Sequence, residues 1–328
     1  MTPARLALDI VLGLILLGIC GLFILVLWMP GSSFHGNQPS YSAAELETEG
    51  ELRRHIGVLA GDIGRRHTKE NLQRTYKYIE SVLSKSGYKS LEQEYVVENT
   101  PCKNIEAELK GATSELVIVC AHYDSVVGTV GADDNASGVA STLEIARLLK
   151  EKSSKKTIRF LLFGTEEPPY FSSRDMGSYH YAMRCKERGE RIAALLDLET
   201  LAYYTEAPNS QHYPSNFMPP GYPTTGNFIA FVGNLKSRSL VEDCVRIFRE
   251  TTTFPSEGIA APEWVNGVDW ADQYWFWKLG YPGVMITDTA PYRYPYYHDV
   301  KDTPEKLSYP AFARVVTGLS KVVDRLAN

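Results

Sequence analysis

Short apolar runs alternate with longer helical patterns through most of this 328-residue chain. The runs with the length and composition of buried strands are residues 115–121, 157–164, 192–198, 227–233 and 281–289. Amphipathic helical patterns separate several of them, and another ends the chain. Nearly continuous apolar strands between helices are typical of a mainly parallel sheet that is covered on both faces. We therefore predict an α/β fold with a mainly parallel, mixed central sheet in a three-layer arrangement.

The N-terminus carries a different pattern, a run without charge from Ile10 to Met29. Its length of about 20 residues matches the apolar core of a bilayer and exceeds the hydrophobic part of a cleavable signal peptide. We therefore predict one N-terminal transmembrane helix. Arg5 is the only basic residue before the run and none follows until Arg53. This asymmetry places the N-terminus in the cytoplasm and the main domain on the extracytoplasmic side.

The segment after the run, residues 30–41, is rich in Gly, Ser and Pro and is typical of a linker. The predicted organisation is thus an anchor and linker over residues 1–41 and one domain over residues 42–328. A net charge of -5 without a basic stripe gives no indication of nucleic-acid binding. The five cysteines form no CxxC pair, so neither a zinc finger nor a disulfide framework is indicated.

Residues with metal-binding side chains follow several of the predicted strands. They are His122, Asp124, Asp134, Glu166, Glu167, Asp197, Glu199 and His298. Such sites form where the carboxyl ends of parallel strands meet. His with carboxylates and without thiolates suits Zn²⁺ in a hydrolytic site, and two ions sharing one carboxylate would use the whole set. Each residue also has a structural explanation, such as a helix N-cap at Asp134 or Asn135, or a solvated Glu pair. Their common position at strand ends favours the metal site.

Five motifs in order carry a resemblance to a known family: "AHYDS", "GADDNASGVA", "TEE", "LETLAYY" and "YYHDVKDTPEKL". From about Leu52 to Leu326 the chain resembles the co-catalytic zinc exopeptidases, which include bacterial leucine-type aminopeptidases, glutamate carboxypeptidases and glutaminyl cyclases. The resemblance implies the three-layer sandwich of that family and two Zn²⁺ per chain. It also implies a metallopeptidase, an aminopeptidase first of all, with peptides as substrates.

The resemblance also implies a role for each residue of the motifs. The expected zinc ligands are His122, Asp134 as the bridge, Glu167, Glu199 and His298. Glu166 is expected to be the general base, and Asp124 to orient His122. The motif "LLDLETLA" offers two carboxylates that point to the same face of a strand. Alignment with the family pattern selects Glu199, and Asp197 stays open.

Two departures from the family pattern concern the pocket more than the ligands. Pro168 and Pro169 replace a Gly-rich turn, and Gln273 stands where relatives often carry His. The loop "TAPYRYPYYHD" either lines a hydrophobic pocket or only packs its own aromatic rings. Glutaminyl cyclase activity, carboxypeptidase polarity and a non-catalytic receptor-like ectodomain remain alternatives on the same fold.

Overall fold

The computed structural model describes residues 5, 9–18, 21, 28–214 and 221–328. Residues 9–18 are helical, and most of the remaining predicted transmembrane run, residues 19–20 and 22–27, lies outside the described residues. Within the described residues, no helix has both the length and the apolar character that a membrane crossing requires.

One mixed sheet forms the centre of the domain, in the strand order β1-β2-β4-β3-β5-β8-β6-β7. The strands are β1 (Leu91–Val97), β2 (Thr100–Leu109), β3 (Thr113–His122), β4 (Lys156–Phe163), β5 (Ile192–Glu199), β6 (Ile229–Gly233), β7 (Ser256–Ala260) and β8 (Val284–Thr287). Strands β4, β3, β5 and β8 are parallel to one another, and β6 is parallel to β7. The pairs β1–β2, β2–β4 and β6–β8 are antiparallel. The predicted mainly parallel, mixed sheet is confirmed in this form.

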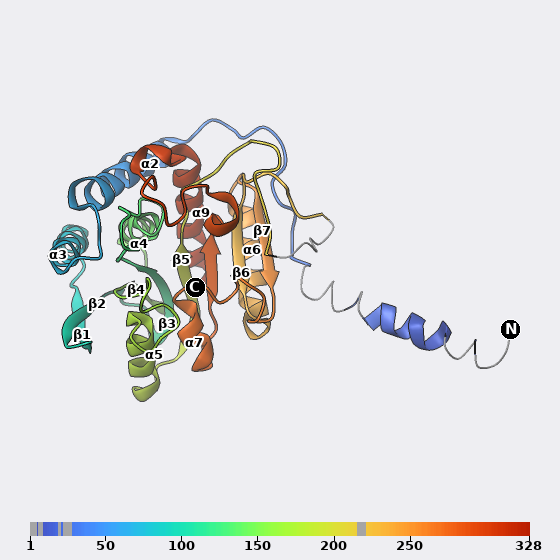
Figure 1. Cartoon of the computed structure of the whole chain (residues 1–328), viewed down its shortest axis with the longest axis horizontal. Coiled ribbons are helices and arrows are strands. Elements are labelled where there is room, and N and C mark those ends of the chain that lie inside the picture. The colour runs from blue at the N-terminus through green and yellow to red at the C-terminus, as the bar shows by residue number, and fades with distance from the viewer. Residues whose placement is uncertain (1–4, 6–8, 19–20, 22–27, 215–220) are drawn as a thin grey trace.

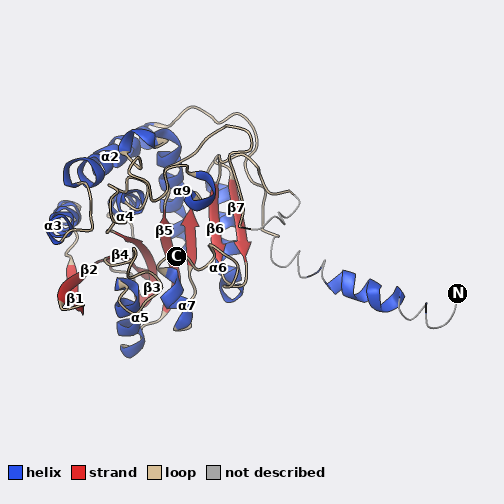
Figure 2. Ribbon diagram, in the orientation of Figure 1, coloured by secondary structure: helices blue, strands red, loops and turns tan. Residues whose placement is uncertain are grey.

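Helices cover both faces of the sheet (Figure 2). The α-helices are α2 (Ala43–Ile56), α3 (Lys69–Lys85), α4 (Ala136–Leu149), α5 (Gly177–Glu187), α6 (Arg238–Thr251), α7 (Gln273–Lys278), α8 (Ala290–Arg293) and α9 (Tyr309–Ala327). A π-helical turn (Gly57–Ile63) extends α2, and short 3₁₀ turns cover Leu235–Ser237 and Pro304–Lys306.

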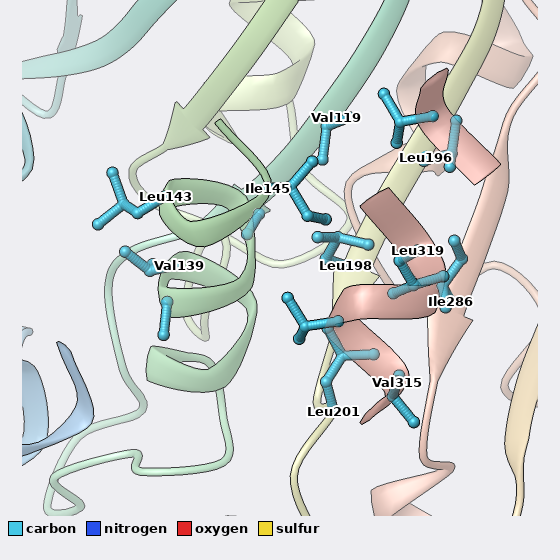
Figure 3. Packing of buried hydrophobic residues seen from close by; sticks show 14 of the residues in the cluster. Val119, Val139, Leu143, Ile145, Leu196, Leu198, Leu201, Ile286, Val315 and Leu319 are labelled. Atoms are coloured by element: carbon cyan, nitrogen blue, oxygen red, sulfur yellow. The ribbon is translucent and has the colours of Figure 1, made fainter. Parts of the chain in front are cut away.

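Strand β3 shows how the layers form. Val117 and Val119 belong to the cluster packed under α2, α4, α6 and α9, whereas Leu116 and Ile118 belong to the cluster under α5 and α7. Successive side chains of a strand point to opposite faces, so an uninterrupted apolar run is buried on both. Figure 3 shows α4 and α9 contributing side chains to one of these clusters above β3, β5 and β8.

Helix α4 approaches β5 so closely that it requires a glycine. A Cβ atom added at Gly138 would lie 2.3 Å from the carbonyl oxygen of Leu198. Asn135 caps this helix by accepting a hydrogen bond from the backbone of Gly138, at 2.9 Å. The sequence "DDNASG" therefore places the start of α4, and the acidic residues before it, directly beside the end of β5.

The predicted linker follows the surface of the domain and is bonded to it at intervals. Arg249 donates to the carbonyls of Pro30 and Gly31, each at 3.0 Å. Further along, Arg314 donates to the carbonyl of Pro39 at 2.8 Å. Figure 1 shows this segment joining the domain beside β7 and then passing over it to α2. Residues 30–41 are thus mostly exposed but follow the surface of the domain, held by these hydrogen bonds. Their Gly, Ser and Pro content suits such an irregular path.

Candidate active site

The predicted ligands and base come from separate parts of the chain and meet at the carboxyl ends of β3, β4 and β5. They form the histidine–carboxylate cluster: His122, Asp134, Glu166, Glu167, Glu199 and His298. All are buried except His298, whose side chain is 33% exposed. The cluster therefore opens toward solvent beside His298.

Asp134 lies between the two histidines. Its Oδ1 is 3.3 Å from His122 Nε2, and its Oδ2 is 3.0 Å from His298 Nε2. Burial acts to raise the pKa of this carboxyl, but the contacts with both histidines hold the pKa below its ordinary value. Glu199 Oε2 is 3.3 Å from His122 Nε2, and Glu167 Oε2 is 3.5 Å from His298 Nε2. Within 3.5 Å of its Nε2, each histidine thus shares Asp134 and has one further carboxylate of its own.

Glu166 lies beside this arrangement, with its Oε2 3.9 Å from His122 Nε2. Burial raises the pKa of Glu166 well above its ordinary value, and the nearby His122 opposes that change. The adjacent Glu167 is fixed differently, since its Oε1 accepts a hydrogen bond from the backbone of Val126 at 2.9 Å. Pro168 and Pro169 follow in a turn that leaves both glutamates in the cluster.

Asp124 connects β3 with the loop that follows β4. Its Oδ1 lies 3.3 Å from His122 Nδ1. Its Oδ2 accepts the backbone N–H groups of Glu166 and Glu167, at 2.9 and 3.1 Å. One carboxylate therefore orients the histidine and both glutamates, which extends the predicted role of Asp124 beyond His122.

Two residues that the sequence did not indicate hold the loop that carries Asp134. Asp302 accepts the backbone N–H groups of Asp133 and Asp134, at 2.9 and 3.2 Å. Asn135 donates to the carbonyl of Leu198 at 2.9 Å and lies 3.3 Å from Glu199 Oε2. Asp302 occurs in a turn-like "KDTP" and Asn135 next to a helix start, where both residue types are common without any role at a site.

Arg66 is the third such residue and is fully buried. Its guanidinium donates to the carbonyls of Tyr123 and Gly131, at 2.9 and 2.8 Å, and its backbone N–H donates to Ser125 Oγ at 3.0 Å. These partners lie at the two ends of the loop between His122 and Asp134. Arg66 therefore sets the path of that loop from a segment 56 residues before His122.

Asp197, the open alternative to Glu199, lies outside the histidine–carboxylate cluster. Its Oδ2 accepts the backbone N–H of Gln273 at 2.7 Å, at the start of α7. Burial raises the pKa of Asp197 to about 6. The side chain of Gln273 donates to the carbonyl of Val268 at 3.0 Å, so it fixes the loop before α7.

The cluster has the composition that a divalent metal requires. Four buried carboxylates stand against two histidines, and in the described part of the chain no Lys or Arg forms an ion pair with them. Asp134 Oδ1 is buried and has no hydrogen-bond partner there. Uncompensated carboxylates are costly to bury, whereas nitrogen and oxygen donors of this kind are suitable Zn²⁺ ligands.

A cavity of about 140 Å³ adjoins the cluster at Glu199. Apolar and aromatic side chains form most of its wall: Phe228, Val232, Met285, Trp270, Tyr292 and Tyr297. Tyr292 and Tyr297 come from the Tyr-rich loop, so this loop lines a pocket as well as packing its own rings. The site thus combines a polar centre with an apolar recess.

A metal-ligand cluster at the ends of parallel strands, with a spare buried carboxylate and an adjoining apolar cavity, defines a metallohydrolase. Residues 104–323 match peptidase family M28, and the chain belongs to this family. Membership supports a zinc metallopeptidase and confirms the resemblance stated from the motifs.

Two relatives show how the similarity is distributed. The uncharacterized protein YfbL of Escherichia coli is 36% identical over 258 residues, which cover 76% of this chain and 79% of that protein. The aminopeptidase YwaD of Bacillus subtilis is 46% identical over 74 residues, 23% of this chain and 15% of that protein.

Solved structures share the fold at low identity. A zinc aminopeptidase from Bacillus subtilis has a TM-score of 0.67 at 16% identity, covering 84% of this chain and 94% of that one. Porphyromonas gingivalis glutaminyl cyclase has a TM-score of 0.63 at 18% identity, covering 86% and 98%.

Proposed function

We propose that this protein is a membrane-anchored aminopeptidase that holds two Zn²⁺ ions and removes N-terminal residues from peptides. The observation that carries the proposal is the division of carboxylates within the histidine–carboxylate cluster. Asp134 has one oxygen toward each histidine, and Glu199 and Glu167 serve one histidine each. Glu166 is left beside them as a buried group free for proton transfer.

Two metal positions follow from this division. His122, Asp134 and Glu199 would hold one ion, and Asp134, Glu167 and His298 the other. Zn²⁺, when bound, lowers the pKa of water and polarises a carbonyl oxygen. Asp134 would bridge the two positions because its oxygens face opposite histidines.

Glu166 would be the general base. Its carboxylate would accept a proton from the attacking water and deliver it to the nitrogen of the leaving peptide. Burial raises the pKa of Glu166, so its carboxylate, when ionised, is a stronger base than an exposed one. Asp124 would keep Glu166 in place through the backbone N–H that it accepts.

The apolar cavity would receive the side chain of the first substrate residue. Its free space of about 140 Å³ and its aromatic wall suit a large apolar side chain such as Leu or Phe. Its position next to Glu199, one of the proposed ligands, would bring that substrate residue close to the metal positions.

The membrane part of the proposal depends on the charge-free run Ile10–Met29 and on the position of Arg5 before it. With this run in the bilayer, the catalytic domain would lie on the extracytoplasmic side.

The test uses the full chain in detergent, loaded with zinc, and a panel of aminoacyl p-nitroanilides. We expect hydrolysis of Leu and Phe derivatives, no hydrolysis when the amine is acetylated, and two Zn²⁺ per chain. Glu166→Gln should retain zinc and lose about 10²–10⁴-fold in kcat. Formation of pyroglutamate from N-terminal Gln without amide hydrolysis would indicate a cyclase. Absence of zinc would favour the receptor-like alternative.

A further inference from the structure

The chain is attached to the folded domain at the end of the apolar run, through Trp28 and Met29. The carbonyl of Trp28 accepts a hydrogen bond from Arg238 at 3.0 Å. Met29 is only 8% exposed and fills the space above Gly258, where an added Cβ would lie 3.0 Å from the Met29 side chain. Among the described residues, the chain is therefore already in contact with the domain at Trp28 and Met29, the last two residues of the run.

This attachment limits the length available for a membrane crossing. With Met29 buried in the domain, eighteen residues remain, Ile10–Leu27. As a helix they would extend about 27 Å, slightly less than the roughly 30 Å apolar core of a bilayer. A crossing of this length brings Trp28, and the part of the domain bonded to it, to the level of the lipid headgroups.

The part of the domain at Trp28 is the carboxyl end of β6 and β7. Residues 28–33 run along the domain from Arg238, at the start of α6, to Ser256, at the start of β7. The backbone N–H of Ser256 donates a hydrogen bond to Ser33 Oγ at 2.9 Å. Residue 28 therefore lies at the far end of β7. Figure 1 shows the chain reaching the domain beside this strand.

The loops at this end expose large apolar side chains. Leu235 is 50% exposed, Trp264 is 82% exposed and Trp28 itself is 58% exposed. Asn234 donates to Glu263 at 2.9 Å, which joins the loop of Leu235 to the loop of Trp264. Trp is favoured at the boundary between lipid and water because its ring is apolar and its N–H is polar.

The charges of this end are compatible with lipid headgroups. Glu263 is paired with Lys278 at 2.8 Å, and Glu242 with Arg238 at 2.8 Å. Lys236 is exposed beside Leu235. These two acidic groups are thus compensated, while the exposed Lys236 adds a cation, which favours contact with anionic lipids.

We propose that the surface formed by Trp28, Leu235, Lys236 and Trp264 rests on the lipid headgroups of the membrane. This inference rests on the membrane anchor in the proposed function. Strand β8 is parallel to β5, whereas β6 is antiparallel to β8 and parallel to β7. The carboxyl ends of β6 and β7 therefore lie at the opposite end of the strands from the histidine–carboxylate cluster. The histidine–carboxylate cluster then lies away from the bilayer.

The experiment uses the full chain in vesicles of phosphatidylcholine and phosphatidylglycerol, with lipids brominated near the top of their acyl chains as quenchers of Trp fluorescence. The chain has five Trp residues. With Trp28 and Trp264 within reach of the quencher, Trp264→Phe should reduce the lipid-dependent quenching by about half. The matched control is Trp270→Phe, since Trp270 is 40% exposed but lines the cavity beside the active site.

The outcomes separate this inference from the anchor. Flotation of the protein with vesicles, together with reduced quenching in Trp264→Phe only, supports the lipid-facing surface. Flotation with unchanged quenching in Trp264→Phe overturns the proposed lipid contact of Trp264 and leaves the anchor standing. Burial of Trp264 against a second protein copy would have the same consequence. Failure to float overturns both, while peptide hydrolysis is measured independently.

Discussion

Replacing Asp124 by Asn changes one atom of the side chain and tests how the histidine–carboxylate cluster is held. The carboxylate of Asp124 accepts two backbone N–H groups on one oxygen and faces His122 Nδ1 with the other. Asn has one oxygen and one NH₂ group, so only one of these sides keeps an acceptor. If the NH₂ faces His122, Nδ1 must accept, and Nε2 then carries the proton and cannot bind a metal. If the NH₂ faces Glu166 and Glu167, donors meet donors and the loop must move.

In either orientation at least one buried donor or acceptor is left unsatisfied. Such a loss costs about 1–3 kcal/mol. At about 1.4 kcal/mol per factor of ten, this corresponds to a decrease of roughly 10–100-fold in zinc affinity, the usual size for residues that orient metal ligands. Both orientations predict weaker zinc binding, and the second also predicts a lower kcat at saturating zinc because Glu166 is displaced.

The measurement is competition for zinc with a chromophoric chelator, followed by hydrolysis of a p-nitroanilide at saturating zinc. Asp62→Asn, at an exposed position, is the control and should match the wild type. A thermal unfolding curve shows that each variant is folded. Wild-type zinc affinity and wild-type kcat in folded Asp124→Asn would refute the role assigned to Asp124.

The remaining predictions concern stability. Chelation of zinc should lower the free energy of unfolding by about 2.7 kcal/mol relative to free zinc at 100 times its Kd, seen by calorimetry; an unchanged Tm would contradict a zinc site. Burial lowers the pKa of His55 to about 3, so below pH 6.5 the unfolded state binds a proton that the folded state does not. Stability is therefore lost as pH falls from 6.5 toward 3, at about 1.4 kcal/mol per pH unit. Urea unfolding of His55→Gln should lack this loss, and an equal loss in both proteins would exclude His55. Gly138→Ala should destabilise by about 1–3 kcal/mol, because its Cβ has no room beside Leu198; wild-type stability in urea would show that α4 can move.

The strands that the sequence predicted are those buried on both faces. Residues 115–121 and 157–164 correspond to β3 and β4, whose apolar runs are uninterrupted. Strands β1, β2 and β7 were not predicted. The first alternates exposed and buried positions and is rich in Glu, and β7 has only five residues at the edge of the sheet. Edge strands pair with a partner on one side only, so their sequences carry a weaker apolar signal.

The cluster was predictable because its residues occur in ordered motifs at strand ends, and the resemblance selected Glu199. Asp197 points to the same face of β5 but lies two residues, or about 7 Å, deeper along the strand. Glu199 is the last residue of β5 and lies in the cluster, and only the structure shows where β5 ends. Arg66 could not be recognised because its neighbour Arg65 has the same side chain and is exposed. Its role depends on contacts with a loop far along the sequence.

The position of Arg66 has a consequence for the smallest fragment of this protein that can be active. The match to peptidase family M28 begins at residue 104 and includes every residue of the histidine–carboxylate cluster. A fragment that begins there would nevertheless lack the guanidinium that ties Tyr123 to Gly131. It would also lack α2, whose Leu52 and Ile56 are fully buried in the core. The boundary of the cooperative folding unit therefore lies before α2, and truncation to the region that matches the family would remove the support of the loop that carries Asp134.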